Sequence, residues 1–144
     1  MTIDQILKDK GFAIISVRAG ETLAAAARTL DGKRIGAVVA LDDAGGIVGV
    51  LSERDIVRHV ARQGAAALNL NVGDAMTRDV IKVDSTTKVD DALQLMTDRR
   101  IRHLPVTSGD ELVGVVSIGD LVKWKIAETE AEAEAMKSYL SAQY

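Results

Sequence analysis

The stretch GVVSIGDLVKWK, residues 114–125, ends an apolar run in a serine and reaches an aspartate three residues later. The stretch GVLSERDIVRHV, residues 49–60, does the same sixty-five positions upstream. In both places β-branched residues give way to a segment with charged residues, which is typical of a strand that runs into a helix. A pattern that occurs twice in this way predicts that the chain contains an internal repeat.

The rest of the chain aligns with itself at nearly the same spacing. Residues 14–40 lie over residues 80–106 at an offset of 66, and residues 47–58 lie over residues 112–123 at an offset of 65. The change of one residue falls in the turn between the two blocks, and neither block needs a gap. Duplication of one unit is therefore the economical explanation.

Each copy contains one apolar helical face. Apolar residues recur at i, i+3, i+4 and i+7, which predicts an amphipathic helix in each copy; they are Leu23, Ala26, Ala27 and Leu30 in the first and Val89, Ala92, Leu93 and Met96 in the second. Thr22 and Thr87 precede these helices and are predicted N-caps.

A hairpin and a second helix follow in each copy. Two β-branched runs surround a turn, AVVAL and IVGVLS in the first copy and LPVT and LVGVVS in the second. The second helices are expected from about Glu53 to Gln63 and from about Ile118 onward. The repeated unit is thus predicted to be strand, helix, strand, strand, helix.

These patterns divide the chain into five segments. We expect a lead-in helix, a first repeat, a linker, a second repeat and an acidic helical tail, over residues 1–10, 11–63, 64–75, 76–125 and 126–144. The tail carries four glutamates and one lysine, which account for the chain's net charge of −3. A solvated extension of the last helix is the favoured interpretation, while Met136, Tyr139 and Leu140 leave a partner helix open.

The amino-acid composition argues against several classes of function. A chain of 144 residues with 47% hydrophobic content can bury a core, and its weak net charge and 3% aromatic content argue against nucleic-acid binding. The absence of cysteine excludes disulfides and thiol chemistry, and two separated histidines make a zinc site improbable. The N-terminus lacks signal-peptide features, so we expect a cytoplasmic protein without a membrane segment.

The repeated Ser-x-x-Asp motif has two interpretations. It has the spacing of a capping box, in which serine and aspartate bind free backbone N–H groups of the first helical turn. It also suits a nucleotide, because a helix N-terminus attracts phosphate and one carboxylate can accept both hydrogen bonds of a ribose diol. The motif alone favours the capping box.

The order of these motifs resembles a tandem pair of cystathionine-β-synthase (CBS) domains, known as a CBS pair or Bateman module. The resemblance spans residues 11–125 and is carried by GIVGVLSERDIVR in the first copy and by MTRDVIKV, DDALQLMTDRRIRHLPV and LVGVVSIGDLVK in the second. It implies a stand-alone module of the bacterial type with an α/β (α+β) fold, in which two β-α-β-β-α repeats pack sheet to sheet with pseudo-twofold symmetry. It also implies a homodimer and an adenosyl ligand, AMP first, with ADP, ATP, NAD(H) or S-adenosylmethionine as alternatives.

The resemblance implies a first ligand site built from both repeats. Asp55 would hold the ribose hydroxyls, Ser52 and Arg54 would lie near phosphate, and backbone groups at Val80 and His103 would read adenine. Arg102 would add a guanidinium group that can donate two parallel hydrogen bonds to phosphate. The full set is Ser52, Arg54, Asp55, Thr77, Asp79, Val80, Arg102, His103, Leu104 and Pro105. Outside this resemblance, Arg102 is an ordinary surface residue and Pro105 the start of an edge strand.

The second implied site departs from the family pattern. The sequence IGAVV stands where the other copy has IRHLPV, so two basic side chains and the proline are missing. Lys33 and Arg34 are potential substitutes, yet we expect weaker binding here. The set is Ala13, Ile14, Gly36, Ala37, Val38, Ser117 and Asp120.

The expected function is regulation by an adenine nucleotide, with a conformational change passed to a separate protein effector. The alternative is a structural dimerisation module that binds no ligand. An enzyme is disfavoured, because the sequence shows no Walker loop, no dinucleotide fingerprint and no catalytic triad order. We therefore expect no catalytic residues, no catalytic cofactor and no metal.

Overall fold

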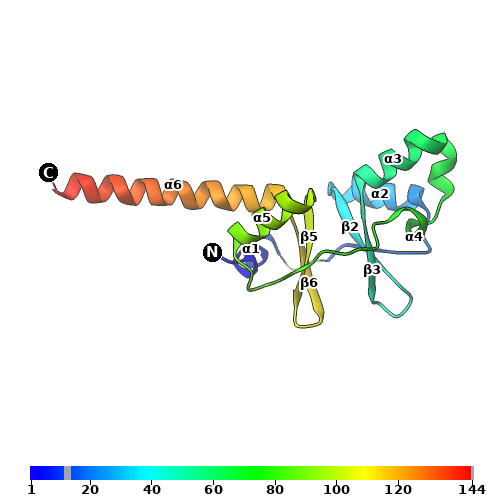
Figure 1. Ribbon diagram of the computed structural model, residues 1–144, viewed down its shortest axis with the longest axis horizontal. Helices are drawn as coiled ribbons and strands as arrows, with labels where there is room; N and C mark the ends of the chain where they lie inside the picture. Colours follow the sequence, from blue (N-terminus) through cyan, green and yellow to red (C-terminus); the bar gives the residue numbers. More distant parts are fainter. Residues whose placement is uncertain (12–13, 144) are drawn as a thin grey trace. The chain divides into compact units, whose positions relative to one another are not determined.

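The computed structural model describes residues 1–11 and 14–143, and it divides into two compact units. The repeat-1 unit comprises residues 14–81, and the repeat-2 unit comprises the described residues of 1–13 and 82–144. Each unit contains one three-stranded sheet (Figure 1). The mixed α/β architecture predicted from the sequence is therefore confirmed.

The repeat-1 unit follows the predicted order of elements. Its elements are β1 (Ser16–Arg18), α2 (Leu23–Lys33), β2 (Ala37–Leu41), β3 (Ile47–Ser52), α3 (Glu53–Gln63), the 3-10 helix η1 (Gly64–Asn69) and α4 (Val72–Ala75). The central strand β2 pairs in parallel with β1 and antiparallel with β3. The hairpin predicted from the two β-branched runs is thus formed by β2 and β3.

The repeat-2 unit has the same topology. Its elements are α1 (Ile3–Lys10), β4 (Val83–Asp84), α5 (Val89–Arg99), β5 (His103–Ser108), β6 (Glu111–Ser117) and α6 (Ile118–Gln143). The central strand β5 pairs in parallel with β4 and antiparallel with β6. The acidic residues after Lys125 continue α6, which projects beyond the sheet of its own unit (Figure 1).

The first helices of the two repeats, α2 and α5, have different N-caps. Thr22 caps α2 as predicted, because its hydroxyl accepts a hydrogen bond from Ala25 N at 3.2 Å. The prediction for Thr87 is wrong, since α5 starts after Lys88 and its N-cap makes no side-chain hydrogen bond. Lys88, one residue later than Thr87, is the position that aligns with Thr22 at the offset of 66. Thr87 lies in the preceding turn, where its N–H donates to Asp84 O at 3.0 Å.

Pro105 lies in the central strand β5, so its interpretation as the start of an edge strand is wrong. It pairs with Val115 of β6. The parallel pairing of β5 with the short strand β4 begins one residue later, at Val106. The missing N–H of proline is therefore tolerated in a central strand because one of its two ladders has not yet started.

Each unit is completed by a helix from the segment that precedes the other repeat. In the repeat-1 unit, Val72 N of α4 donates to Glu21 O at 2.8 Å; in the repeat-2 unit, Ile3 N of α1 donates to Thr87 O at 2.9 Å. Glu21 and Thr87 align at the offset of 66, so α1 and α4 occupy equivalent places. Residues 64–75, expected to form a linker, therefore contribute to a core, and Ala67 and Val72 are fully buried.

The predicted helical faces form the centre of each core. In the repeat-1 unit, buried side chains of α2, the sheet and α4 form one cluster, which includes Leu23, Ala26, Leu30, Val38, Leu51 and Val72. In the repeat-2 unit the fully buried side chains include Ile3, Ile6, Leu7, Val89, Met96, Leu104 and Leu121. Ala27 and Leu93, at the edge of each predicted face, are half-buried. Burial of such side chains contributes about 1.5–3 kcal/mol each.

Candidate functional site

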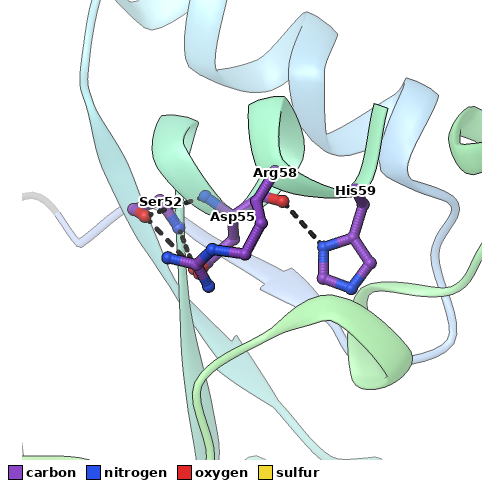
Figure 2. Close-up of polar contacts among 4 residues, drawn as sticks. All are labelled: Ser52, Asp55, Arg58 and His59. Atoms are coloured by element: carbon purple, nitrogen blue, oxygen red, sulfur yellow. Dashed lines mark hydrogen bonds and ion pairs between the residues drawn. The ribbon is translucent and has the colours of Figure 1, made fainter. Parts of the chain in front are cut away.

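The first Ser-x-x-Asp motif forms a capping box at the junction of β3 and α3. Asp55 N donates to Ser52 Oγ at 3.3 Å, and Asp55 Oδ2 accepts from Ser52 N at 2.9 Å and from Ser52 Oγ at 3.1 Å. Figure 2 shows these contacts at the first turn of α3. The capping interpretation of the sequence is therefore confirmed for this copy.

The rest of the Asp55 carboxylate faces a basic side chain of its own helix. Only 6% of the Asp55 side chain is exposed, and Arg58 Nη1 lies 3.4 Å from Asp55 Oδ1 (Figure 2). Arg58 itself is largely exposed. The distance is long for a charge-assisted hydrogen bond, so this ion pair is weak. The neighbouring His59 is held by its Nδ1, which lies 2.8 Å from Asp55 O.

The second motif forms the same cap in the repeat-2 unit. Asp120 N donates to Ser117 Oγ at 3.1 Å, and Ser117 N donates to Asp120 Oδ2 at 2.9 Å. A third group joins this pair: Lys10 Nζ of α1 lies 2.7 Å from Asp120 Oδ2 and donates to Val115 O at 3.0 Å. Asp120, with 26% of its side chain exposed, thus forms a close ion pair with a different element.

The surroundings of Asp120 favour its ionised form. Burial raises the pKa of the Asp120 carboxyl, but hydrogen bonds from Lys10 and Ser117 and the positive charge of Lys10 outweigh it. The net result is a pKa below the ordinary value of 3.8. At neutral pH the Asp120 carboxyl is therefore ionised.

The other candidates of the repeat-1 unit lie along the outer edge of β3 and at the start of α3. Thr77 and Val50 exchange backbone hydrogen bonds at 2.9 and 3.0 Å, which places Thr77 two residues from Ser52 along β3. Arg54 is exposed in the first turn of α3. Asp79 is exposed and Val80 is half-buried. The structure thus brings Ser52, Asp55 and Thr77 together within one unit.

The candidates at the start of each middle strand lie beside the serine of their own repeat. His103 pairs with Ser117 and Ala37 pairs with Ser52. The carbonyls of Arg102 and Gly36 accept from the first N–H of the following helix, at Ile118 (2.8 Å) and Glu53 (2.9 Å). Arg102 and Ile14 are exposed, while Leu104, Pro105 and Val38 are buried. Ala13 lies outside the described residues. The two ligand sites, each of which was expected to combine residues of both repeats, stay predictions.

The family assignment rests on both repeats. The CBS domain family matches residues 11–62 and 72–127, and each match contains one of the two copies found by self-comparison. The chain belongs to the CBS domain family. Its two copies form a CBS pair, as the resemblance of the sequence indicates.

Several relatives share the whole pair. The chain is 33% identical over 99% of its length to the mitochondrial CBS domain-containing protein CBSX3 of Arabidopsis thaliana, covering 73% of that protein. The crystal structure of the CBS-domain protein ATU1752 from Agrobacterium tumefaciens matches with 39% identity and a TM-score of 0.83, covering 85% of this chain and 91% of that one. The CBS domain protein PAE2072 from Pyrobaculum aerophilum, complexed with AMP, matches with 30% identity and a TM-score of 0.75, covering 83% and 89%.

Two further observations concern other kinds of site. In the part of the chain that the structure describes, no group of three His, Asp or Glu side chains is placed to hold a metal ion. No described helix is both long enough and apolar enough to cross a membrane.

Sequence reasoning missed Lys10, which forms an ion pair with Asp120 from another element. The signal is present in the lead-in helix, where Ile3, Ile6, Leu7 and Lys10 follow the spacing i, i+3, i+4 and i+7. A lysine that ends a buried helical face is expected to snorkel toward a polar partner. Which partner it finds depends on the docking of α1 against the second CBS repeat, and the local sequence does not encode that.

Proposed function

We propose that this CBS pair is a regulatory module that binds an adenosine-containing ligand, with the Asp55 carboxylate as the ribose acceptor and AMP as the first candidate. The observation that carries the proposal is the geometry of Asp55. Its Oδ2 accepts the hydrogen bonds of the cap, while its Oδ1 has, among the described residues, a single long contact, 3.4 Å from Nη1 of the exposed Arg58 side chain. Because each carboxylate oxygen can accept two hydrogen bonds, the cap and a ribose diol can share this carboxylate.

The relative from Pyrobaculum aerophilum supports the choice of ligand, because it is a CBS domain protein whose structure is a complex with AMP. Charged side chains that suit a phosphate are present near the proposed site. Arg54 is exposed one residue before Asp55, where it can turn toward an anion at the start of α3. The contribution of Arg102, His103, Leu104 and Pro105 to the same site is part of this proposal.

Regulation requires that the ligand binds two arrangements of the module with unequal affinity, since equal affinity shifts no equilibrium. We include in the proposal a homodimer, a separate effector protein and a cytoplasmic location. ADP, ATP, NAD(H) and S-adenosylmethionine stay alternatives to AMP, because all of them present the same ribose and adenine groups.

The test is isothermal titration calorimetry of the full chain with each of these ligands, followed by the substitution Asp55→Asn. Asparagine can still accept the hydrogen bond from Ser52 N, but it lacks the charge and the second acceptor oxygen. Loss of a charge-assisted hydrogen bond predicts about 10- to 100-fold weaker binding.

Thr22→Ala is the matched control for this test. It removes a helix cap in the same unit without changing a proposed site residue, at a cost of about 1 kcal/mol in stability. We expect it to leave ligand affinity unchanged. Binding that is insensitive to Asp55→Asn would contradict the assignment of Asp55.

The second candidate function is a structural dimerisation module that binds no ligand. It is favoured by the complete capping boxes, in which both serines and both aspartates already have protein partners. It predicts that no adenosine-containing ligand produces heat or raises the melting temperature. Conversion of ATP or NADH by the purified chain would instead contradict both non-enzymatic functions.

A further inference from the structure

Lys10 marks a difference between the two CBS repeats. In the repeat-2 unit, Lys10 Nζ donates to Asp120 Oδ2 at 2.7 Å and to Val115 O at 3.0 Å. Val115 aligns with Val50 at the offset of 65, and Val50 O accepts a hydrogen bond from the backbone N–H of Thr77 at 2.9 Å. The Lys10 ammonium thus takes the place of a backbone donor and adds a positive charge beside the aspartate.

We call the contacts of Lys10 with Asp120 and Val115 the Lys10 clamp. Among the described contacts, the equivalent aspartate in the repeat-1 unit has no such clamp. Asp55 pairs at 3.4 Å with Arg58, which comes from its own helix one turn later and can leave without moving any other element. Asp120 pairs at 2.7 Å with a residue that lies 110 positions away in the sequence. Only the second of these contacts depends on the docking of a separate helix.

The clamp is held in place by the core. Ile3, Ile6 and Leu7 of α1 are fully buried, and the Cβ of an alanine at position 114 would lie 2.7 Å from Leu7 Cδ2. The backbone of α1 is also bound to the turn before α5 through Ile3 N and Asp4 N, at 2.9 Å each. Lys10 therefore approaches Asp120 from a fixed helix, so no backbone has to be ordered when the contact forms.

A ribose diol cannot readily displace this lysine. Its hydroxyls are neutral donors, whereas the Lys10 ammonium also attracts the Asp120 carboxylate as an opposite charge 2.7 Å away. A diol that replaced the ammonium would leave that carboxylate without its counter-ion. Displacement would also leave Val115 O without its ammonium donor. The Oδ2 atom of the carboxylate that a nucleoside needs in this repeat is therefore already bound by Lys10 and by Ser117 N.

We propose that Lys10 closes the nucleoside site at Asp120, so that each chain binds a single adenosine-containing ligand, at Asp55. The inference rests on the proposed function, because it assumes that an aspartate of this motif without a lysine partner accepts a ribose. It assigns the lead-in helix α1 a role in setting the number of ligands per chain. A lysine that served as a phosphate ligand would have the opposite effect, since its removal would weaken binding.

The test is the stoichiometry of AMP binding, measured by calorimetry on the full chain and on Lys10→Met. We expect one AMP per chain for the unchanged protein and two for Lys10→Met, with the added site lost again in Lys10→Met/Asp120→Asn. Lys8→Met is the control, because Lys8 is exposed on the same helix. It should leave the stoichiometry at one.

Two additions keep the test decisive. Lys10→Gln can still donate to Val115 O and serves if the methionine variant does not fold; it should give the same gain. Adenosine, used as a second probe, should gain the same site, because the proposed competition concerns the ribose and not a phosphate.

The two proposals can fail separately. Binding to the unchanged chain that survives Asp55→Asn would contradict the proposed function. Two sites in the unchanged chain, or no site gained on removal of Lys10, would overturn the closure by Lys10. One site that appears only in the Lys10 variants and disappears with Asp120→Asn would support the closure and reject Asp55.

Discussion

At the scale of single residues, Asp55 and Asp120 have the same capping role but different counter-ions. Both accept from the backbone N–H of the serine three residues earlier at 2.9 Å. Asp120 alone has a close ammonium partner, at 2.7 Å. The same motif therefore gives two carboxylates with different ionic partners, and the difference arises outside the motif.

The charge of Asp120 makes its contribution to stability depend on pH. Its pKa lies below 3.8 in the folded chain, so the unfolded chain binds the proton more readily and stability rises with pH. The contribution is fully present above about pH 5 and is lost as the pH falls through the lowered pKa. We expect Asp120→Asn to reduce the free energy of unfolding by about 1 kcal/mol at pH 7, and by less below pH 3.8.

Urea denaturation of both proteins between pH 7 and pH 3 measures this effect. The pKa values of Asp4 and Asp84 are also lowered, by hydrogen bonds from Thr2 and Thr86 respectively. Their contributions cancel in the difference between the two proteins. A difference that stays constant down to pH 3 would show that the Asp120 carboxylate does not stabilise the fold through its charge.

At the scale of elements, the hairpins and helices of both repeats follow from periodicity and turn residues. The errors concern positions where another element decides the outcome. Thr87 was predicted to cap α5, yet its carbonyl binds Ile3 N of α1 and the helix starts after Lys88. Pro105 suits an edge strand by its chemistry, but the short length of β4 leaves room for it in the centre of the sheet.

Gly49 and Gly114 occupy equivalent positions on β3 and β6, but they meet different neighbours. A Cβ at Gly49 would lie 2.8 Å from the backbone Thr77 O and 2.5 Å from Met76 Sδ, whereas a Cβ at Gly114 would meet the end of the Leu7 side chain. Thr77 O is fixed by Val50 N at 3.0 Å. We expect Gly49→Ala to cost about 3 kcal/mol and Gly114→Ala about 1 kcal/mol, as overpacking does.

Chemical denaturation of the two single variants tests this order. Leu7→Val should recover part of the loss in Gly114→Ala, because valine lacks the two Cδ atoms that the new methyl group meets. An equal loss in both glycine variants would show that α1 and the Met76–Thr77 segment are equally rigid.

At the scale of the whole molecule, the duplication was visible in the sequence, but the exchange of helices between repeats was not. Residues 64–75 have the small and polar composition of a linker, yet Ala67 and Val72 are fully buried in the repeat-1 unit. Lys10 precedes the first repeat and binds Asp120 of the second. Such contacts depend on the path of the chain in space, which periodicity and motif spacing do not determine.

This exchange predicts that a core substitution acts on the repeat that is remote in sequence. Ile6→Ala, just before the first repeat, should destabilise the repeat-2 unit by about 2–5 kcal/mol, because Ile6 is 1% exposed in that unit's core. Native-state hydrogen exchange should then be faster in β4, β5, β6 and α5 than in the unchanged chain.

Val72→Ala is the reciprocal variant, since Val72 precedes the second repeat but is buried in the repeat-1 unit. We expect it to accelerate exchange in β1, β2, β3 and α2 while the repeat-2 sheet retains more of its protection. The two variants thus give opposite exchange patterns if each unit has its own core. Uniform acceleration of all amides in both variants would show instead that the two units unfold only together, so that the ligand-free chain behaves as one cooperative structure.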